Sequence, residues 1–330
     1  MVKAKQLKKR IFNIKTQQDF IDLTLDIFNY QYHNNDIYRL FIQLIGCNPN
    51  SITHINEIPF LPIEFFKQNK IVSGKDKEKI IFLSSGTTDI VQSKHYITDL
   101  EIYKTSFIKS FNIFFGNPEK YTILALLPNY LEREGSSLVF MVNELIKRSN
   151  DQHSGFYLHN YKELLNKISD LRKSKKKILL IGVSYALLDL PISDSGIFEN
   201  VIIMETGGMK GKRKEMTKNE LHKTLQAKYN VGNINSEYGM TELLSQAYST
   251  GKGLFSTPPW MKVIIRDTYD PFSYLEEGRS GGINIIDLAN LNSCSFIETK
   301  DIGKLKANNQ FEVLGRFDNS DIRGCNLLIG

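Results

Sequence analysis

The stretch Asn233-Ile-Asn-Ser-Glu-Tyr-Gly-Met-Thr-Glu-Leu-Leu-Ser-Gln-Ala-Tyr248 carries the pattern around which the rest of the chain is organised. An extended apolar run at residues 229–234 predicts a strand, and a helical pattern begins at Thr241. Backbone N–H groups and the dipole at a helix start favour a bound anion. Glu242 adds a carboxylate that can hold a metal ion, and Tyr238 adds a flat ring for a base. Taken alone, the stretch is better explained as an ordinary turn capped by threonine.

A second loop of small residues favours a functional role for both. Ser84-Ser-Gly-Thr-Thr88 directly follows the apolar run at residues 80–83. Its hydroxyl and backbone donors can wrap a polyphosphate. The G-x-x-x-x-G-K-[ST] spacing of a Walker loop is missing, so a P-loop nucleotide hydrolase is not predicted.

Apolar runs without alternation predict strands that are buried on both faces, as in a parallel sheet. They occupy residues 80–83, 121–127, 178–183 and 201–204. Helical patterns separate most of them, including one over 98–115, one over 136–148 and one after the capping box Thr217-Lys-Asn-Glu220. This β-α-β order places ligands at the C-terminal ends of the strands.

After about residue 255 the pattern changes to short strands separated by Gly or Asp turns. These strands are expected at 262–266, 282–287, 295–298 and 311–314. We therefore predict an α/β fold in which mostly parallel sheets are flanked by helices and joined by a smaller β-rich subdomain. The predicted divisions are 1–255 for nucleotide and acyl binding, 256–315 for the β-rich subdomain and 316–330 for a C-terminal tail. Near the N-terminus, helices are expected over 16–32, capped by Thr16, and over 36–45.

Composition narrows the classes of partner and compartment. The chain has 330 residues, 41% of them hydrophobic, and a net charge of +6. Its basic clusters at 173–177 and 210–214 are separate and lack interleaved aromatics, so nucleic-acid binding is not predicted. The N-terminus lacks the apolar core of a signal peptide, and no apolar run is long enough to span a bilayer. Three cysteines without paired spacing indicate a reducing cytoplasm.

Four motifs in collinear order resemble those of adenylate-forming enzymes, the superfamily of acyl-CoA synthetases, luciferases and peptide adenylation domains. They are Ser84-Ser-Gly-Thr-Thr88, Tyr238-Gly-Met-Thr-Glu242, Thr299-Lys-Asp-Ile-Gly303 and Gly315-Arg-Phe-Asp318. Two further stretches, Met204-Glu-Thr-Gly-Gly-Met-Lys-Gly211 and Asp321-Ile-Arg-Gly-Cys-Asn-Leu-Leu328, are similar to its LuxE-type acyl-protein synthetase branch. The resemblance covers roughly residues 60–328.

The resemblance implies an ATP site with Mg²⁺, to which each motif contributes. It places the β- and γ-phosphates on the loop residues Ser84, Ser85, Gly86, Thr87 and Thr88, and the α-phosphate and Mg²⁺ on Thr241 and Glu242. By the same resemblance, adenine lies against Gly207 and Gly208 and stacks on Tyr238, with Gly239 and Met240 beside it. The ribose binds Asp301, assisted by Arg316. A carboxylate attacking the α-phosphorus needs neutralised charge and in-line positioning, which such groups supply.

The chain departs from the superfamily pattern in two places. After Thr88 the loop lacks the usual Gly and nearby Lys, which leaves Lys94 as the candidate phosphate contact. The superfamily's adenylation lysine lies on a C-terminal domain of about 100 residues, whereas this sequence ends 14 residues after Arg316. We therefore expect that small domain to be largely absent. Either adenylation does without that lysine, or Lys210, Lys212 or Arg213 replaces it, or the chain does not adenylate.

Cys325 is the candidate acyl carrier, because the LuxE-type branch carries its acyl group on a cysteine close to the C-terminus. Arg323 would stabilise its thiolate, and Gly324 would act as a hinge. An inert packing role for Cys325 is the alternative, and packing is the interpretation we favour for Cys47 and Cys294.

The functional hypothesis is an enzyme that activates a carboxylic acid, such as a long-chain fatty acid, with ATP and transfers the acyl group to Cys325 or a partner's thiol. One alternative is an acyltransferase that takes acyl groups from CoA or a carrier protein without adenylation. The other is a non-catalytic nucleotide-binding subunit of a reductase complex. The expected partners are an acyl-accepting reductase or a carrier protein, and assembly into homo- or hetero-oligomers is left open. His95 could approach the carboxylate site, although its H-x-x-x-D pattern with Asp99 is common by chance.

Overall fold

The structure, a computed structural model, describes residues 3–85, 91–128, 133–207 and 216–317. Its central sheet has the strand order β5-β4-β6-β7-β8-β9, and all neighbours are parallel except β8 and β9. The strands are β4 (Tyr121–Leu126), β5 (Gly155–Phe156), β6 (Lys177–Val183), β7 (Val201–Thr206), β8 (Asn235–Tyr238) and β9 (Ala247–Ser249). Every residue of β4 is buried, as the continuous apolar run predicts.

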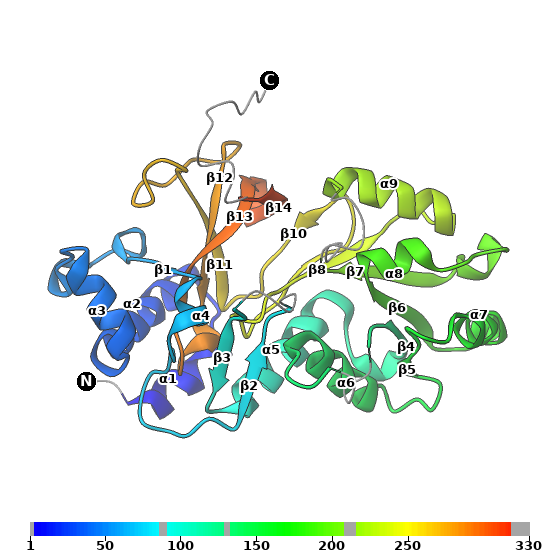
Figure 1. The fold of residues 1–330 in the computed structure, drawn as a ribbon, viewed down its shortest axis with the longest axis horizontal. Helices are drawn as coiled ribbons and strands as arrows, with labels where there is room; N and C mark the ends of the chain where they lie inside the picture. The colour runs from blue at the N-terminus through cyan, green and yellow to red at the C-terminus, as the bar shows by residue number, and fades with distance from the viewer. Residues whose placement is uncertain (1–2, 86–90, 129–132, 208–215, 318–330) are drawn as a thin grey trace.

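Helices cover both faces of this sheet (Figure 1). Two of them, α5 (Leu100–Phe115) and α6 (Ser137–Ser149), lie on one side, whereas α8 (Ser184–Asp189) and α9 (Lys218–Tyr229) lie on the other. The helix α7 (Tyr161–Asp170) connects β5 to β6. The predicted capping box is present, because Thr217 and Glu220 exchange hydrogen bonds at the start of α9. The predicted β-α-β organisation is confirmed for this half of the molecule.

The apolar run at residues 80–83 does not join the parallel sheet. It forms β2 (Ile80–Leu83), which pairs antiparallel with β3 (Lys94–Ile97) in a separate hairpin. The prediction of a fourth parallel strand is therefore wrong. Its basis was weak, since only Phe82 in this strand is buried and its neighbours are half-exposed.

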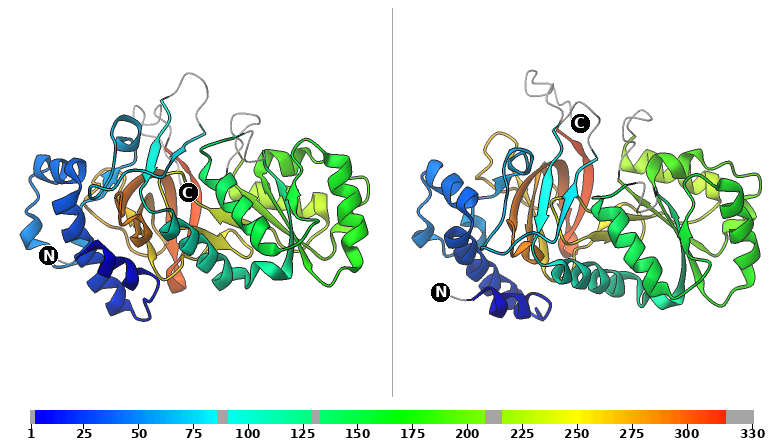
Figure 2. Two further views of the ribbon diagram at one scale, coloured as in Figure 1. Left: turned by 90° about the horizontal axis from the view of Figure 1, so that it is seen from below. Right: turned by 60° about the horizontal axis from the view of Figure 1, so that its bottom comes forward.

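A second sheet is antiparallel apart from one edge strand. It has the order β10-β14-β13-β12-β11, and β1 pairs in parallel with β13. Its strands are β1 (Leu61–Pro62), β10 (Leu254–Phe255), β11 (Met261–Arg266), β12 (Ser280–Asp287), β13 (Phe296–Lys306) and β14 (Gln310–Arg316). This confirms the predicted β-rich region, which lies between the N-terminal helices and the parallel sheet in both views of Figure 2.

One glycine of this sheet is required by a buried arginine. The guanidinium of Arg266 donates to the carbonyls of Ile283 and Thr299 at 3.1 and 2.8 Å and to Asn284 Oδ1 at 2.9 Å. It lies directly against Gly282, where a Cβ atom would overlap it. A side chain at this position would push the guanidinium away from its partners.

The N-terminal helices α1 (Ala4–Ile11), α2 (Gln17–Asn34), α3 (Asp36–Leu44) and α4 (Phe65–Gln68) pack beside the second sheet. The predicted cap at Thr16 is present, so the helix expected over 16–32 is confirmed with slightly later ends. Gln31 is fully buried. It donates to the carbonyls of Asn290 and Leu291 at 3.0 Å and accepts from the backbone N–H of Ser295 at 2.9 Å.

Short 3₁₀ turns complete the described elements. They lie at Pro49–Ser51, Ile55–Glu57, Pro118–Lys120, Leu171–Lys173, Ser195–Phe198, Leu288–Asn290 and Ala307–Asn309. Within the described ranges, no helix has both the length and the apolar character needed to cross a bilayer.

Two predictions around the opening stretch are wrong. Residues 229–234 are not a strand, because α9 continues to Tyr229 and β8 begins at Asn235. No helix begins at Thr241, where a turn leads through a loop to β9. The reason is Asp287, whose Oδ2 accepts from the backbone N–H groups of Leu244 and Ser245, both at 2.9 Å. A distant carboxylate thus satisfies backbone donors that a helix would have used.

Candidate functional site

The two sheets meet at Tyr238, the last residue of β8. Its hydroxyl donates to Asp301 Oδ2 on β13 at 2.7 Å. Arg316 lies opposite Asp301 in the β13–β14 register, and its Nε is 3.9 Å from Oδ1. Burial raises the pKa of Asp301, and the hydrogen bond from Tyr238 and the charge of Arg316 partly offset this rise. Three residues from separate motifs are therefore brought together, as the resemblance implies.

The ring of Tyr238 is held by two aromatic neighbours. The ring centroids of Phe255 and Phe311 lie 5.8 and 5.6 Å from its own, at steep interplanar angles. The ring remains only half-buried. This fixed and partly open ring can stack on a flat ligand.

The loop that follows Tyr238 is joined to the β2–β3 hairpin. His95 on β3 donates from Nδ1 to the carbonyl of Thr241 at 2.9 Å. Glu242 is 5% exposed, and a hydrogen bond links its side chain to Ser93, beside β3. Burial raises the pKa of Glu242, whereas this hydrogen bond and the more distant charge of Arg316 lower it. The hairpin therefore places Ser93 and His95 beside two predicted site residues.

His95 has one fixed nitrogen and one unpartnered nitrogen. Because a carbonyl only accepts, Nδ1 carries the proton and Nε2 the lone pair. Burial lowers the pKa of His95 to about 4, so the ring is neutral near pH 7. Its Nε2 is buried and has no hydrogen-bond partner among the described residues.

The predicted phosphate loop is described only at its first residues. Ser84 closes the hairpin: its N–H donates to the carbonyl of Ser93 at 3.1 Å, and its Oγ accepts from the N–H of Ser93 at 2.9 Å. Ser85 is exposed, as is Lys94 on β3. Gly86, Thr87 and Thr88 lie outside the described residues.

Some of the other predicted site residues lie within the described ranges and some lie outside them. Gly207 follows β7 with φ +68°, a conformation that favours glycine, and it is exposed. Gly239 is exposed and Met240 half-buried in the loop after β8. Gly208, Lys210, Lys212, Arg213 and Cys325 lie outside the described residues. Cys294 is fully buried with its Sγ 3.4 Å from the carbonyl of Phe296, which confirms its predicted packing role.

Sequence reasoning missed a buried charge cluster at the ends of β7 and β8. Lys218 Nζ and His222 Nε2 lie 2.7 and 3.4 Å from Glu205 Oε1, and Ser184 Oγ lies 3.2 Å from its Oε2. Burial by itself would raise the pKa of Glu205, but the charge of Lys218 and the surrounding hydrogen bonds outweigh it and lower the pKa to about 2. The capping box at Thr217 places Lys218 at a helix start, but no local signal predicts its partner.

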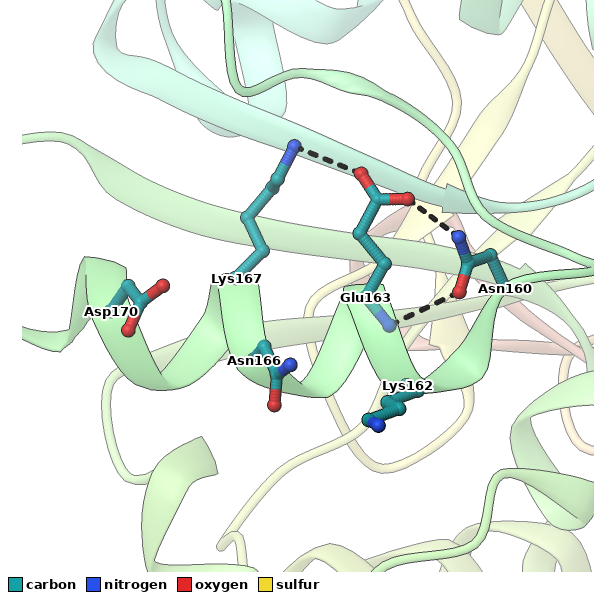
Figure 3. A pocket seen from close by; sticks show the side chains of 6 residues that line it. All are labelled: Asn160, Lys162, Glu163, Asn166, Lys167 and Asp170. Atoms are coloured by element: carbon teal, nitrogen blue, oxygen red, sulfur yellow. Dashed lines mark hydrogen bonds and ion pairs between the residues drawn. The ribbon is translucent and has the colours of Figure 1, made fainter.

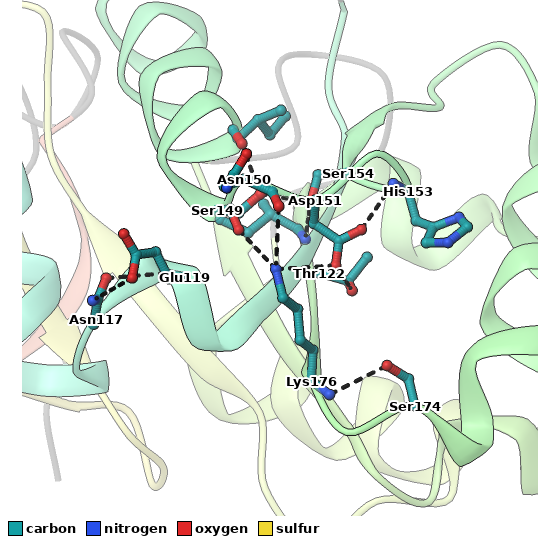
Figure 4. Close-up of polar contacts among 12 residues, drawn as sticks. Asn117, Glu119, Thr122, Ser149, Asn150, Asp151, His153, Ser154, Ser174 and Lys176 are labelled. Carbon is teal, nitrogen blue, oxygen red and sulfur yellow. Dashed lines mark hydrogen bonds and ion pairs between the residues drawn. The ribbon is translucent and has the colours of Figure 1, made fainter.

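Two other polar features of the described residues lie apart from the predicted site residues. A hollow of about 370 Å³ lies along α7, where Asn160 and Lys167 bond Glu163 of the same segment (Figure 3). Before the N-terminal end of β6, Lys176 bridges Asp151 and the carbonyl of Ser149 at 3.3 and 2.8 Å (Figure 4). These contacts tie the end of α6 to the start of β6, away from the strand ends that hold Tyr238.

Comparisons with known proteins support the fold. No family model matches the chain. The chain is 24% identical to the long-chain-fatty-acid–luciferin-component ligase of Vibrio harveyi over 338 residues, which is 91% of this chain and 84% of that protein. The ATP-bound structure of MatB from Rhodopseudomonas palustris has TM-score 0.54 and 18% identity over 74% of this chain and 49% of that chain.

A structure of 2-hydroxyisobutyryl-CoA ligase in the postadenylation state, in complex with R3-HIB-AMP, has TM-score 0.64 at 9% identity. It covers 94% of this chain and 70% of that chain. The chain thus spans about half the length of the MatB chain it matches. The likenesses confirm the fold class of adenylate-forming enzymes and the resemblance to LuxE-type acyl-protein synthetases.

Proposed function

We propose that this chain activates a carboxylic acid with ATP and transfers the acyl group to a protein thiol. The observation that carries the proposal is the convergence of distant motifs: Tyr238 and Asp301 are bonded across two sheets, Arg316 faces them, and Glu242 lies nearby beside the β2–β3 hairpin. A flat ring, a ribose acceptor, a cation and a metal-binding carboxylate are the groups an adenylate requires.

The proposed reaction has two balanced steps. A carboxylate oxygen bonds to the α-phosphorus, and pyrophosphate leaves with the electron pair of the broken phosphoanhydride bond. A thiolate sulfur then bonds to the acyl carbon, and AMP leaves. Thr241 binds the α-phosphate, and Asp301 accepts from the ribose hydroxyls with the help of Arg316. Gly207 lies against adenine. Cys325 is the proposed thiol, with the thiol of a partner reductase or carrier protein as the onward acceptor.

The donor set at Glu242 is compatible with Mg²⁺. Among the described residues, no three His, Cys, Asp or Glu side chains converge to form an all-protein metal site. Mg²⁺ is usually held by one or two carboxylates together with substrate phosphates. Glu242 can provide that single carboxylate, and the bound ion would offset phosphate charge as pyrophosphate leaves.

The substrate class follows from the curated relative, whose name specifies long-chain fatty acids. We extend this to a fatty or other carboxylic acid as the substrate of this chain. We also place the protein in the cytoplasm, a reducing compartment that suits the free thiols of Cys47 and Cys294.

The test is exchange of labelled pyrophosphate into ATP, measured with Mg²⁺ and a panel of carboxylic acids. Acid-dependent exchange supports the proposal, and its absence with every acid counts against adenylation. Mass spectrometry should then find a hydroxylamine-labile acyl group that a Cys325→Ser variant cannot form. A Cys47→Ser variant, which removes a half-buried thiol, should be labelled normally. Labelling by acyl-CoA without ATP would identify an acyltransferase instead.

A further inference from the structure

Lys218 lies at a helix position that is unfavourable for a positive charge. It is the first residue of α9, next to the positive end of the helix dipole, which disfavours an ammonium group. The helix start is already completed by the reciprocal hydrogen bonds of Thr217 and Glu220. Lys218 therefore contributes little to α9 itself. Its ammonium instead turns toward Glu205, which is fully buried, and donates to Oε1 at 2.7 Å.

The carboxylate that holds Lys218 is itself fixed. The hydroxyl of Ser184 hydrogen-bonds both Glu205 Oε2, at 3.2 Å, and the carbonyl of Gly207, at 2.9 Å. His222 Nε2 lies between Glu205 Oε1 and Ser236 Oγ, at 3.4 and 3.0 Å. Glu205, two residues before Gly207 in the sequence, is therefore a buried and hydrogen-bonded carboxylate that holds the ammonium of Lys218.

The ammonium of Lys218 lies beside one of the aromatic rings that pack against Tyr238. Its Nζ lies 5.9 Å from the ring centroid of Phe255, the ring that packs against Tyr238. Its charge also acts on Asp301, where it helps to lower the pKa against the larger effect of burial. Lys218 thus belongs to the Asp301 side of the site.

An ammonium has three N–H donors, and within the described residues Glu205 is the one hydrogen-bond acceptor that Lys218 Nζ contacts. Its side chain is 24% exposed, so a ligand can reach it. An N–H donor held in this way beside the ring of Phe255 can hydrogen-bond an oxygen or nitrogen acceptor of a nucleoside.

We propose that Lys218 is a further binding residue of the nucleotide site, donating to an acceptor on the ribose or the purine, with Glu205 as its positioning residue. The inference rests on the proposed function, because it assumes that a nucleotide binds beside Tyr238. It assigns Lys218 to the nucleoside end of the ligand and leaves the pyrophosphate end to the β2–β3 hairpin.

Removing Lys218 alone would leave Glu205 charged and buried, which can unfold the protein. The informative variant is therefore the double change Glu205→Gln with Lys218→Met, which removes both charges. Titration calorimetry with AMP and, separately, with inorganic pyrophosphate measures the two ends of the site. Loss of one charge-assisted hydrogen bond should raise the Kd for AMP about tenfold or more. The Kd for pyrophosphate should stay unchanged.

Two further variants separate binding from folding. Lys218→Arg, with Glu205 unchanged, should keep most of the wild-type AMP affinity, and Lys223→Met, which removes the same charge from an exposed position of α9, should have no effect. A double variant that melts like the wild type and binds AMP equally well would refute the role of Lys218. Equal losses for AMP and pyrophosphate would refute its assignment to the nucleoside end. A wild-type protein that binds neither ATP nor AMP would instead refute the proposed function.

Discussion

Replacing Glu237 with glutamine should change how the stability of the protein depends on pH. Glu237 precedes Tyr238, is 6% exposed and accepts a hydrogen bond from the hydroxyl of Thr206. Burial raises its pKa to about 7; the Thr206 hydrogen bond lowers it, Glu205 raises it further and Lys218 lowers it. Burial dominates, so in the folded protein Glu237 keeps its proton until the pH approaches about 7.

The size of the effect follows from the difference between the folded and unfolded pKa values of Glu237. A rise from 4.5 to about 7 corresponds to about 3 kcal/mol. Below pH 4.5 the carboxyl is protonated in both states and its ionisation has no effect. Between pH 4.5 and 7 the unfolded chain releases the proton that the folded protein keeps, so stability falls as pH rises. Above pH 7 the full penalty remains. The Glu237→Gln variant escapes this penalty and should gain about 3 kcal/mol relative to the wild type between pH 4.5 and 8.

Urea unfolding of the two proteins at intervals from pH 4.5 to 8.5 measures this difference. Asp287, whose pKa burial raises to about 6, is present in both proteins, so its contribution cancels. Glu205, with a pKa of about 2, titrates below this range. A Glu101→Gln variant changes an exposed carboxyl of α5 and should give a curve parallel to the wild type. Parallel curves for Glu237→Gln and the wild type would show that Glu237 ionises normally in the folded protein, and the reasoning would fail.

Three other substitutions test the site and the sheet beside it. Glu242→Gln should lower acid-dependent pyrophosphate exchange by about 100-fold and raise the Mg²⁺ concentration needed for half-maximal rate; an unchanged Mg²⁺ requirement would remove Glu242 from the metal site. Tyr238→Phe deletes the hydrogen bond that lowers the pKa of Asp301. Asp301 should then take up its proton at a higher pH, so as pH falls the variant should lose AMP binding at a higher pH than the wild type. Gly282→Ala should cost about 1–3 kcal/mol in urea unfolding because the new methyl group meets the Arg266 guanidinium, whereas Gly232→Ala, with open space around it, should not show this overlap cost.

The sequence predicted the parallel half of the fold because strands that are buried on both faces appear in a sequence as continuous apolar runs. The runs that became β4, β6 and β7 are apolar at nearly every position, and the cap at Thr217 fixes the start of α9. The candidate site was reached differently. Motif resemblance implied that Tyr238 and Asp301 share one site, whereas nothing local in either segment points to a residue 63 positions away, and the hydrogen bond between them comes from the structure.

The failures share one physical origin. The helix expected at Thr241 has suitable local residues, but Asp287, at the end of β12, accepts from the N–H groups of Leu244 and Ser245. Asn290, in the turn after β12, also accepts from Leu244. Tertiary hydrogen bonds of this kind override local propensity. The Lys218–Glu205 ion pair could not be predicted either, because its two residues lie on different elements, α9 and β7, which only the tertiary fold brings together.

The contacts of Gln31 impose an order on folding during synthesis. Among the described residues, the partners of its amide, which is fully buried in α2, all lie some 260 positions later in the chain. At about 5–20 residues per second, the ribosome needs roughly 13–50 seconds to deliver those partners. For that interval α2 can already pack on α1 and α3, but its buried amide lacks these partners. Translation therefore makes α2 early, but the contacts of its amide can form only when residues 290–295 have been made.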